Sequence, residues 1–212
     1  MSRDGGGRTE GWRNLALGTT AVVASMVLLF SVPAPEFVAA TFLSTTCMII
    51  VSLVLGLRWR GKPTAKALAA GIASAAVLYL VFAAGAVGIG VLHPFGIAAS
   101  DSASIYSLIA SPGNAAYVQV AVLLFDSAGY ESFFRGILQA RLRQALGPWA
   151  APAVAGIDAA VHIVTLNPLW VATTFVADLA WGLTFHLSGR LSASFTSHFI
   201  WDVTVFLLFP LR

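Results

Sequence analysis

KALAAGIASAAVLYLVFAAGAVGIGVL occupies residues 66–92 and has no charged residue after Lys66. A helix needs about 20 apolar residues to cross the hydrocarbon core of a bilayer, and this run is longer than that. A helix on the surface of a soluble protein has a polar side that faces water, and this apolar run would provide none. The run therefore indicates a helix that spans a membrane.

The composition of the whole chain agrees with this interpretation. The 212 residues are 58% hydrophobic and only 10% charged, and the mean hydropathy is +0.84. A soluble domain has roughly 45–50% apolar and about 25% charged residues. The composition thus excludes a soluble globular domain and also a disordered chain. The net charge of +3 is too small to suggest a nucleic-acid partner, and the single cysteine, Cys47, excludes an internal disulfide.

Further apolar runs divide the chain into similar segments, separated by Pro, Gly and Asn residues that end helices. We predict an all-α polytopic membrane protein with one transmembrane domain over residues 1–212. No internal repeat and no second domain is evident. The expected seven helices cover residues 14–32, 37–57, 66–92, 114–140, 149–166, 169–187 and 191–209.

Basic residues in the loops predict the orientation, because cytoplasmic loops of membrane proteins are enriched in Lys and Arg. Ten of the 12 basic residues fall on one side of the predicted bundle, and only Arg212 falls on the other. The remaining one, Arg135, lies inside a helix. We therefore expect a protein of the cell membrane with a cytoplasmic N-terminus and an external C-terminus. The ten are Arg3, Arg8, Arg13, Arg58, Arg60, Lys62, Lys66, Arg141, Arg143 and Arg190.

Two other features belong to the membrane boundaries. Tryptophans stand at four predicted span ends, where they would anchor the helices at the lipid headgroups; they are Trp12, Trp59, Trp149 and Trp170. The external segment 93–113 has a possible short helix with Ser100 as its N-cap and Asp101 in its first turn. This helix would lie on the outer interface, cover the bundle or simply form part of a loop.

Ionisable residues inside the spans are confined to the last four helices. Inserting one carboxylate at the centre of a membrane helix costs roughly 2.5–3.5 kcal/mol. Five unpaired carboxylates would therefore destabilise the protein too strongly. They must face one another, water or a ligand, and we predict a polar site among the fourth to seventh helices. The residues are Asp126, Glu131, Arg135, Asp158, His162, Asp178, His186, His198 and Asp202.

Six of these residues form pairs four positions apart, so that both members share a helix face. The pairs are Glu131 with Arg135, Asp158 with His162, and His198 with Asp202. A carboxylate beside a histidine fixes the tautomer of the ring and tunes its basicity, which is suited to activating a water molecule. A single pair can also be an ordinary link between helices. Asp126 and Asp178 have no such partner, and we expect them either to support the site residues or to bridge helices, and not to take part in chemistry.

The fourth helix contains Tyr130-Glu131-Ser132-Phe133-Phe134-Arg135-Gly136, which resembles the first motif of the CPBP family of CAAX proteases and bacteriocin-processing proteins, also called Abi. That motif is two glutamates, three mostly apolar residues and Arg-Gly. His162 falls where the family has its second motif. His198-Phe199-Ile200-Trp201-Asp202 is similar to the third motif, His-x-x-x-Asn/Asp. The resemblance covers residues 114–206.

The resemblance implies an all-helical intramembrane endopeptidase of the glutamic type, which needs no cofactor. Its substrate would be a peptide or a lipid-modified peptide held at the membrane. By this resemblance Glu131 and His162 activate water, His198 and Asp202 polarise the peptide carbonyl, and Arg135 holds Glu131. We predict that these five residues line one cavity that opens toward the cytoplasmic half of the bilayer.

Three positions depart from the family pattern. Tyr130 replaces the first glutamate, Asp158 replaces a phenylalanine, and Asp202 is a carboxylate where an amide is common. A phenol stays protonated at neutral pH, so Tyr130 cannot act as a general base. Either the chemistry has moved to Glu131 and Asp158, or it has been lost.

Four hypotheses remain open at this stage. The first is the endopeptidase, and the second is a family member without activity that serves as a partner or assembly factor of another membrane protein. The third is a proton or ion pathway through the carboxylates, although no inverted repeat supports it. The fourth is a metal site built from His162, His198 and carboxylates, which lacks a His-Glu-x-x-His motif.

Overall fold

A computed structural model of the chain describes residues 4–33, 36–57, 59, 62–92, 106 and 116–211. Within these residues the structure is almost entirely helical and contains no strand, which confirms the predicted fold class. The possible helix at 100–109 lies outside the described residues, apart from Tyr106. The first three helices are α1 (Asp4–Leu29), α2 (Phe37–Val54) and α3 (Ala65–Leu92).

The second half of the chain has shorter helices that are joined by tighter turns. Helix α5 (Ala116–Phe133) continues through a π-helical segment (Phe134–Gln139) into α6 (Ala140–Leu146). A 3₁₀ turn (Gly147–Trp149) leads into α7 (Ala150–Val161), which ends in a second 3₁₀ turn (His162–Thr165). The chain closes with α8 (Pro168–Ser188), α9 (Leu191–Val203) and a π-helical segment (Thr204–Leu208).

All seven predicted apolar runs coincide with helical segments. Four of the described helices are long and apolar enough to cross a membrane. Of the remaining helices, α5, α7 and α8 carry ionisable residues in their interiors, and α7 has only 12 residues. The four spanning candidates are Thr9–Leu29, Phe37–Val54, Ala65–Gly88 and Leu191–Leu208.

Local sequence signals explain where the helices turn. Gly147 has φ +57° and Gly189 has φ +63°, a region of backbone conformation that glycine adopts without a steric penalty. Gly189 ends α8 and allows the chain to reverse into α9. At the other end of α8, the Asn167 side chain accepts a hydrogen bond of 3.0 Å from the Trp170 backbone N–H, and Pro168 occupies the first helical turn.

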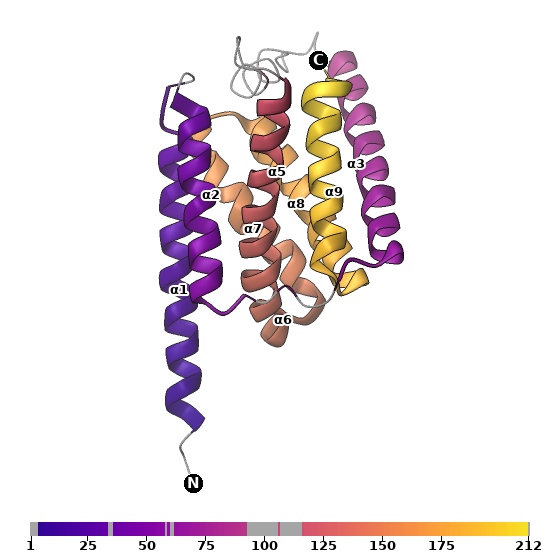
Figure 1. The fold of residues 1–212 in the computed structure, drawn as a ribbon. Helices are drawn as coiled ribbons and strands as arrows, with labels where there is room; N and C mark the ends of the chain where they lie inside the picture. The colour runs from indigo at the N-terminus through magenta and orange to yellow at the C-terminus, as the bar shows by residue number, and fades with distance from the viewer. Residues whose placement is uncertain are drawn as a thin grey trace.

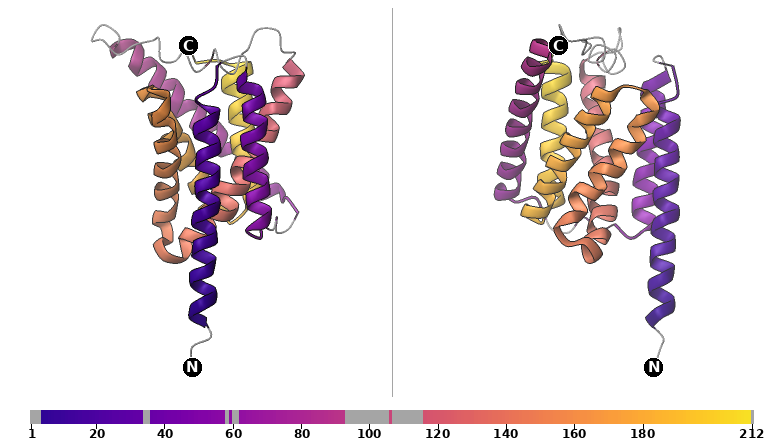
Figure 2. Two further views of the ribbon diagram at one scale, coloured as in Figure 1. Left: turned by 90° about the vertical axis from the view of Figure 1, so that its left-hand side faces the viewer. Right: turned by 180° about the vertical axis from the view of Figure 1, so that it is seen from behind.

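The helices form a bundle of two rows. In the first row α1 packs on α2, α2 on α5, α5 on α9 and α9 on α3 (Figure 1). Helices α7 and α8 pack on each other behind this row and contact α1, α3, α9 and the π-helical segment after α5, as the rear view in Figure 2 shows. Glu131 of α5, Asp158 of α7, Asp178 of α8 and His198 of α9 are all buried inside this bundle.

The ends of the bundle agree with the predicted distribution of charge. The N-terminus, the α2–α3 link, α6 and the α8–α9 turn lie at one end, and the C-terminus lies at the other (Figures 1 and 2). The first end carries the basic residues of these segments that the structure describes; they are Arg13, Lys62, Lys66, Arg141, Arg143 and Arg190.

The outer surface of the first helices is apolar. Leu43 and Val54 of α2 and Leu80 and Val87 of α3 are among the large hydrophobic side chains that remain exposed. Such a surface is unfavourable in water and suited to lipid. Trp12, Trp59 and Trp149 are also exposed, as interface anchors would be, whereas the Trp170 ring packs against Phe30 at a centroid distance of 5.2 Å.

Candidate active site

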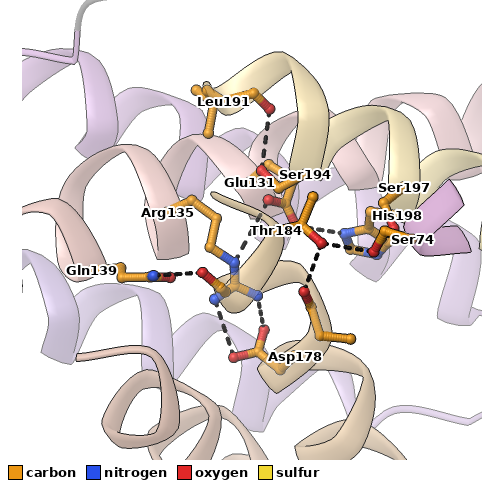
Figure 3. A network of polar contacts seen from close by, with 12 residues as sticks. Ser74, Glu131, Arg135, Gln139, Asp178, Thr184, Leu191, Ser194, Ser197 and His198 are labelled. Atoms are coloured by element: carbon orange, nitrogen blue, oxygen red, sulfur yellow. Dashed lines mark hydrogen bonds and ion pairs between the residues drawn. The ribbon is translucent and has the colours of Figure 1, made fainter. Parts of the chain in front are cut away.

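The predicted site residues are buried in the bundle. Glu131, Arg135 and Asp158 are fully inaccessible, and His162, His198 and Asp202 are at most 5% exposed. Burying so many charged groups is costly unless they contact one another. The structure shows how most of this cost is offset, through one network that links α5, α8 and α9 (Figure 3).

Arg135 is the cation of this network. Its two terminal nitrogens both donate to the carboxylate of Asp178 on α8, and the Nη1–Oδ2 distance is 3.1 Å. Its Nε lies 3.6 Å from Oε2 of Glu131, one turn earlier in the same helical stretch. A bidentate arginine–carboxylate pair is strong and geometrically specific. Arg135 therefore fixes α8 against α5 and orients Glu131.

Glu131 uses its other oxygen to hold a histidine from a third helix. Oε1 lies 3.0 Å from Nδ1 of His198 on α9. The second ring nitrogen of His198, Nε2, lies 3.3 Å from Oδ2 of Asp202, one turn further along α9. Both ring nitrogens thus face carboxylates, and an imidazolium can donate to both whereas a neutral imidazole can donate to only one.

Aromatic side chains hold the His198 ring in place. The Trp181 ring of α8 stacks on it at a centroid distance of 3.6 Å and an interplanar angle of 12°. Tyr130 contacts the same imidazole edge-on, with ring centroids 5.3 Å apart. Two carboxylates at its ring nitrogens and two aromatic neighbours therefore fix the position of the His198 ring.

A second group lies on α7. The Nδ1 atom of His162 is 3.0 Å from the Asp158 carbonyl oxygen and 3.8 Å from the carboxylate oxygen Oδ1 of the same residue. The His162 ring packs against Phe30 and Trp170, at centroid distances of 4.4 and 5.8 Å. From α5, Tyr130 faces the Asp158 carboxylate without forming a well-aligned hydrogen bond.

All three pairs predicted from the four-residue spacing are present. Helical periodicity alone places Glu131 by Arg135, Asp158 by His162, and His198 by Asp202. The pairing between helices differs from the one that the family resemblance implied. Glu131 contacts His198, and no hydrogen bond or ion pair among the described residues joins it to His162.

The two lone aspartates bridge helices, as predicted. Asp178 binds Arg135 across the contact between α8 and the π-helical segment after α5, and Asp126 of α5 accepts a hydrogen bond of 2.6 Å from the Thr45 hydroxyl of α2. The specific role of Asp178 as the main partner of Arg135 was not predicted. Its only signal in the sequence is a carboxylate in the middle of an apolar helix, which requires some partner.

Three further contacts of the site escaped prediction. Gln139 donates to the Gly182 carbonyl oxygen at 2.8 Å, and Ser127 lies 3.4 Å from Oδ2 of Asp202. Trp181 stacks on His198, as described above. An apolar or weakly polar residue in a transmembrane run carries no signal that separates such a contact from ordinary packing.

The π-helical segment Phe134–Gln139 begins three residues after Glu131. One extra residue per turn rotates the side chains that come after it relative to those before it, and such segments are often found at functional sites. Here the segment carries both Arg135 and Gln139, which contact different residues of α8. The π-helical segment therefore helps Arg135 and Gln139, which lie close together in the chain, to contact two different positions on α8.

The site combines carboxylates with histidines inside the bundle. In the part of the chain that the structure describes, no group of three or more His, Cys, Asp or Glu side chains is arranged to hold a metal ion. The groups present are carboxylates next to histidines in a dry interior, where electrostatic interactions are stronger than in water. These are the components of general acid–base catalysis.

The fold and the buried charges define a class: an all-helical, multi-pass membrane protein with a polar site inside its helix bundle. Residues 112–204 match the family model described as Type II CAAX prenyl endopeptidase Rce1-like. This match is consistent with the CPBP family and confirms the resemblance predicted from the three motifs. No curated protein and no solved structure matches the chain.

Proposed function

We propose that this protein is an intramembrane endopeptidase that hydrolyses a peptide bond of a membrane-associated substrate. The observation that carries the proposal is the convergence of motif residues from two separate helices in one buried network: Glu131 contacts Arg135 within one helical stretch and His198 on α9. It is supported by the match of residues 112–204 to endopeptidases. In this proposal Glu131, His162, His198 and Asp202 contact the reacting atoms, and Tyr130, Arg135 and Asp158 support them.

The proposed reaction needs only water and the side chains of the chain. A carboxylate with a neighbouring histidine removes a proton from water, and the water oxygen bonds to the peptide carbonyl carbon. His198, held by Glu131 through Nδ1, polarises the carbonyl oxygen through Nε2, which exchanges its contact with Asp202 for one with the substrate. The proton then passes to the leaving nitrogen as the carbon–nitrogen bond breaks. The closed, dry setting strengthens each electrostatic contribution.

We further propose the setting in which this happens. Residues 1–212 form a single transmembrane domain, with the motif-bearing region at 114–206, that crosses the cell membrane seven times from a cytoplasmic N-terminus. Because the site residues are almost inaccessible, a peptide reaches them only after neighbouring helices separate. Substrates that are already anchored in the membrane, such as lipid-modified peptides, meet the bundle from the side without first dissolving in water.

The test is a cleavage assay on the purified protein in detergent or nanodiscs. Two internally quenched peptides serve as probes, a prenylated peptide with a CAAX-type C-terminus and the same peptide without the lipid. We expect cleavage of the prenylated probe, and loss of cleavage in His198→Ala, which removes the group that both Glu131 and Asp202 hold. Lack of cleavage of both probes by the native protein would contradict the proposal.

A second function is favoured by one observation. Glu131, Arg135 and His198 are all engaged by partners within the chain, as residues with a structural role would be. We therefore keep as the alternative a proteolytically inactive protein that serves as a partner or assembly factor for another membrane protein. Co-purification of one stoichiometric membrane protein, unchanged in Glu131→Gln, would favour this alternative over the endopeptidase.

A further inference from the structure

The buried carboxylates of the site differ in how their oxygens are used. Glu131 faces Arg135 and His198, Asp178 holds Arg135 with both oxygens, and Asp126 accepts from Thr45. Asp158 is the exception. It is completely buried, yet neither of its carboxylate oxygens accepts a well-aligned hydrogen bond among the described residues, although Tyr130 faces it. Within the described part of the chain, its one ion-pair contact is with the His162 ring, at 3.8 Å.

An unpartnered buried carboxylate destabilises a protein and needs an explanation. Natural proteins retain such groups at sites where function depends on them, at some cost in stability. The surroundings of Asp158 fit this explanation, since it faces Tyr130 of α5 and lies on the same helical turn as His162.

We propose that Asp158 is the general base of the hydrolysis and that Glu131 instead positions Arg135 and His198. This inference rests on the proposed endopeptidase function and revises two of the roles given there, since it makes Asp158 the residue that activates the water and Glu131 a positioning residue. The Asp158 carboxylate takes one proton from water while the water oxygen bonds to the peptide carbonyl carbon. It then gives that proton to the leaving nitrogen as the carbon–nitrogen bond breaks, which regenerates the carboxylate.

His162 completes this pair. If its Nδ1–H donates to the Asp158 carbonyl oxygen, 3.0 Å away, the ring is fixed in the tautomer that keeps a lone pair on Nε2. Such a nitrogen accepts a hydrogen bond from the attacking water and orients it. Asp158 and His162 share one helix, so their relative position depends on helical geometry and not on the packing of two helices.

Tyr130 faces the Asp158 carboxylate from a second helix. It approaches Asp158 from α5, while its ring stacks on Phe134 at a centroid distance of 4.4 Å and contacts His198. A residue at position 130 therefore reaches the same space as the Asp158 carboxylate. A carboxylate placed at 130 should be able to replace one at 158, which makes the inference testable by exchange.

The first experiment compares Asp158→Asn with Asp126→Asn in the peptide cleavage assay. Both changes remove a buried carboxylate from a transmembrane helix, but Asp126 is bonded to Thr45 and lies outside the proposed catalytic groups. We expect Asp158→Asn to lower kcat about 10²–10⁴-fold with little change in KM, the range of general-base contributions. Asp126→Asn should leave kcat within a few-fold of the native value.

Thermal stability distinguishes a catalytic role of Asp158 from a structural one, because the two roles predict opposite changes in Tm. Removing the charge of an unpartnered carboxylate relieves a burial cost, so the Tm of Asp158→Asn should equal or exceed that of the native protein. In contrast, Glu131→Gln weakens contacts to Arg135 and His198, and it should lower Tm and activity together. A fall in both Tm and activity for Asp158→Asn would identify a structural residue and overturn the inference.

The exchange experiment adds a gain of function. Asp158→Phe should be inactive, and Tyr130→Glu combined with Asp158→Phe should restore measurable cleavage. A folded but inactive double variant would contradict the inference that side chains at positions 130 and 158 reach the same space. Near-native cleavage by Asp158→Asn, with His198→Ala inactive, would overturn Asp158 as the base and leave the endopeptidase standing. An inert native protein would instead contradict the endopeptidase itself.

Discussion

At the scale of single residues, the core of the site is a network in which two basic side chains contact three carboxylates. Arg135 contacts Glu131 and Asp178, and His198 lies between Glu131 and Asp202, so that Glu131 is shared. A buried ion pair adds little net stability compared with apolar packing, but removal of one partner leaves a charge without compensation. Substitution of a carboxylate that contacts Arg135 should therefore destabilise the protein strongly.

We predict that Asp178→Asn destabilises the protein by about 3 kcal/mol or more, at the lower end of the cost of breaking a buried pair, because Glu131 remains near Arg135. The measurement is the Tm of thermal unfolding in mild detergent. Asp126→Asn is the control, since the Thr45 hydroxyl can still donate to an amide oxygen at that position. Equal Tm values for the two variants would show that the Arg135–Asp178 pair is not a main constraint.

At the scale of helices, close approach depends on small residues. A Cβ added to Gly71 of α3 would lie 2.5 Å from the Ala193 carbonyl oxygen and 2.7 Å from the Thr196 Cβ, both on α9. The first of these atoms belongs to a helix backbone, which cannot move aside without shifting the helix. Small residues at such points allow helices in membranes to pack tightly. This contact brings α3 against α9, the helix that carries His198.

We predict that Gly71→Ala lowers stability by about 1–3 kcal/mol, the usual range for overpacking a close contact. Gly85→Ala is the matched control on the same helix, because a Cβ there meets no atom within 4 Å. It should leave Tm unchanged or slightly higher. Indistinguishable Tm values for the two alanine variants would contradict the close α3–α9 contact.

At the scale of the whole molecule, the two rows of helices create a dry interior for the polar residues and an apolar exterior for lipid. The basic segments gather at the end that holds the N-terminus (Figure 1). Positively charged loops remain on the cytoplasmic side during insertion. The orientation that we propose follows from this asymmetry together with the number of crossings.

Reporter fusions test that topology directly. A reporter placed after Arg60 should signal a cytoplasmic position, and one placed after Arg212 should signal the opposite side of the membrane. An odd number of crossings between the two points is required for this result. The same side for both fusions would contradict a seven-helix topology.

The sequence was sufficient to predict the membrane class, the helical runs and the pairs at four-residue spacing, because hydropathy and helical periodicity act within one segment of chain. It did not reveal that Asp178 holds Arg135, that Glu131 contacts His198 and not His162, or that Trp181 stacks on the imidazole. These contacts depend on how each helix is rotated and how it packs on its neighbours. The isolation of the Asp158 carboxylate has the same origin, since only the packed bundle determines which buried charges find partners and which do not.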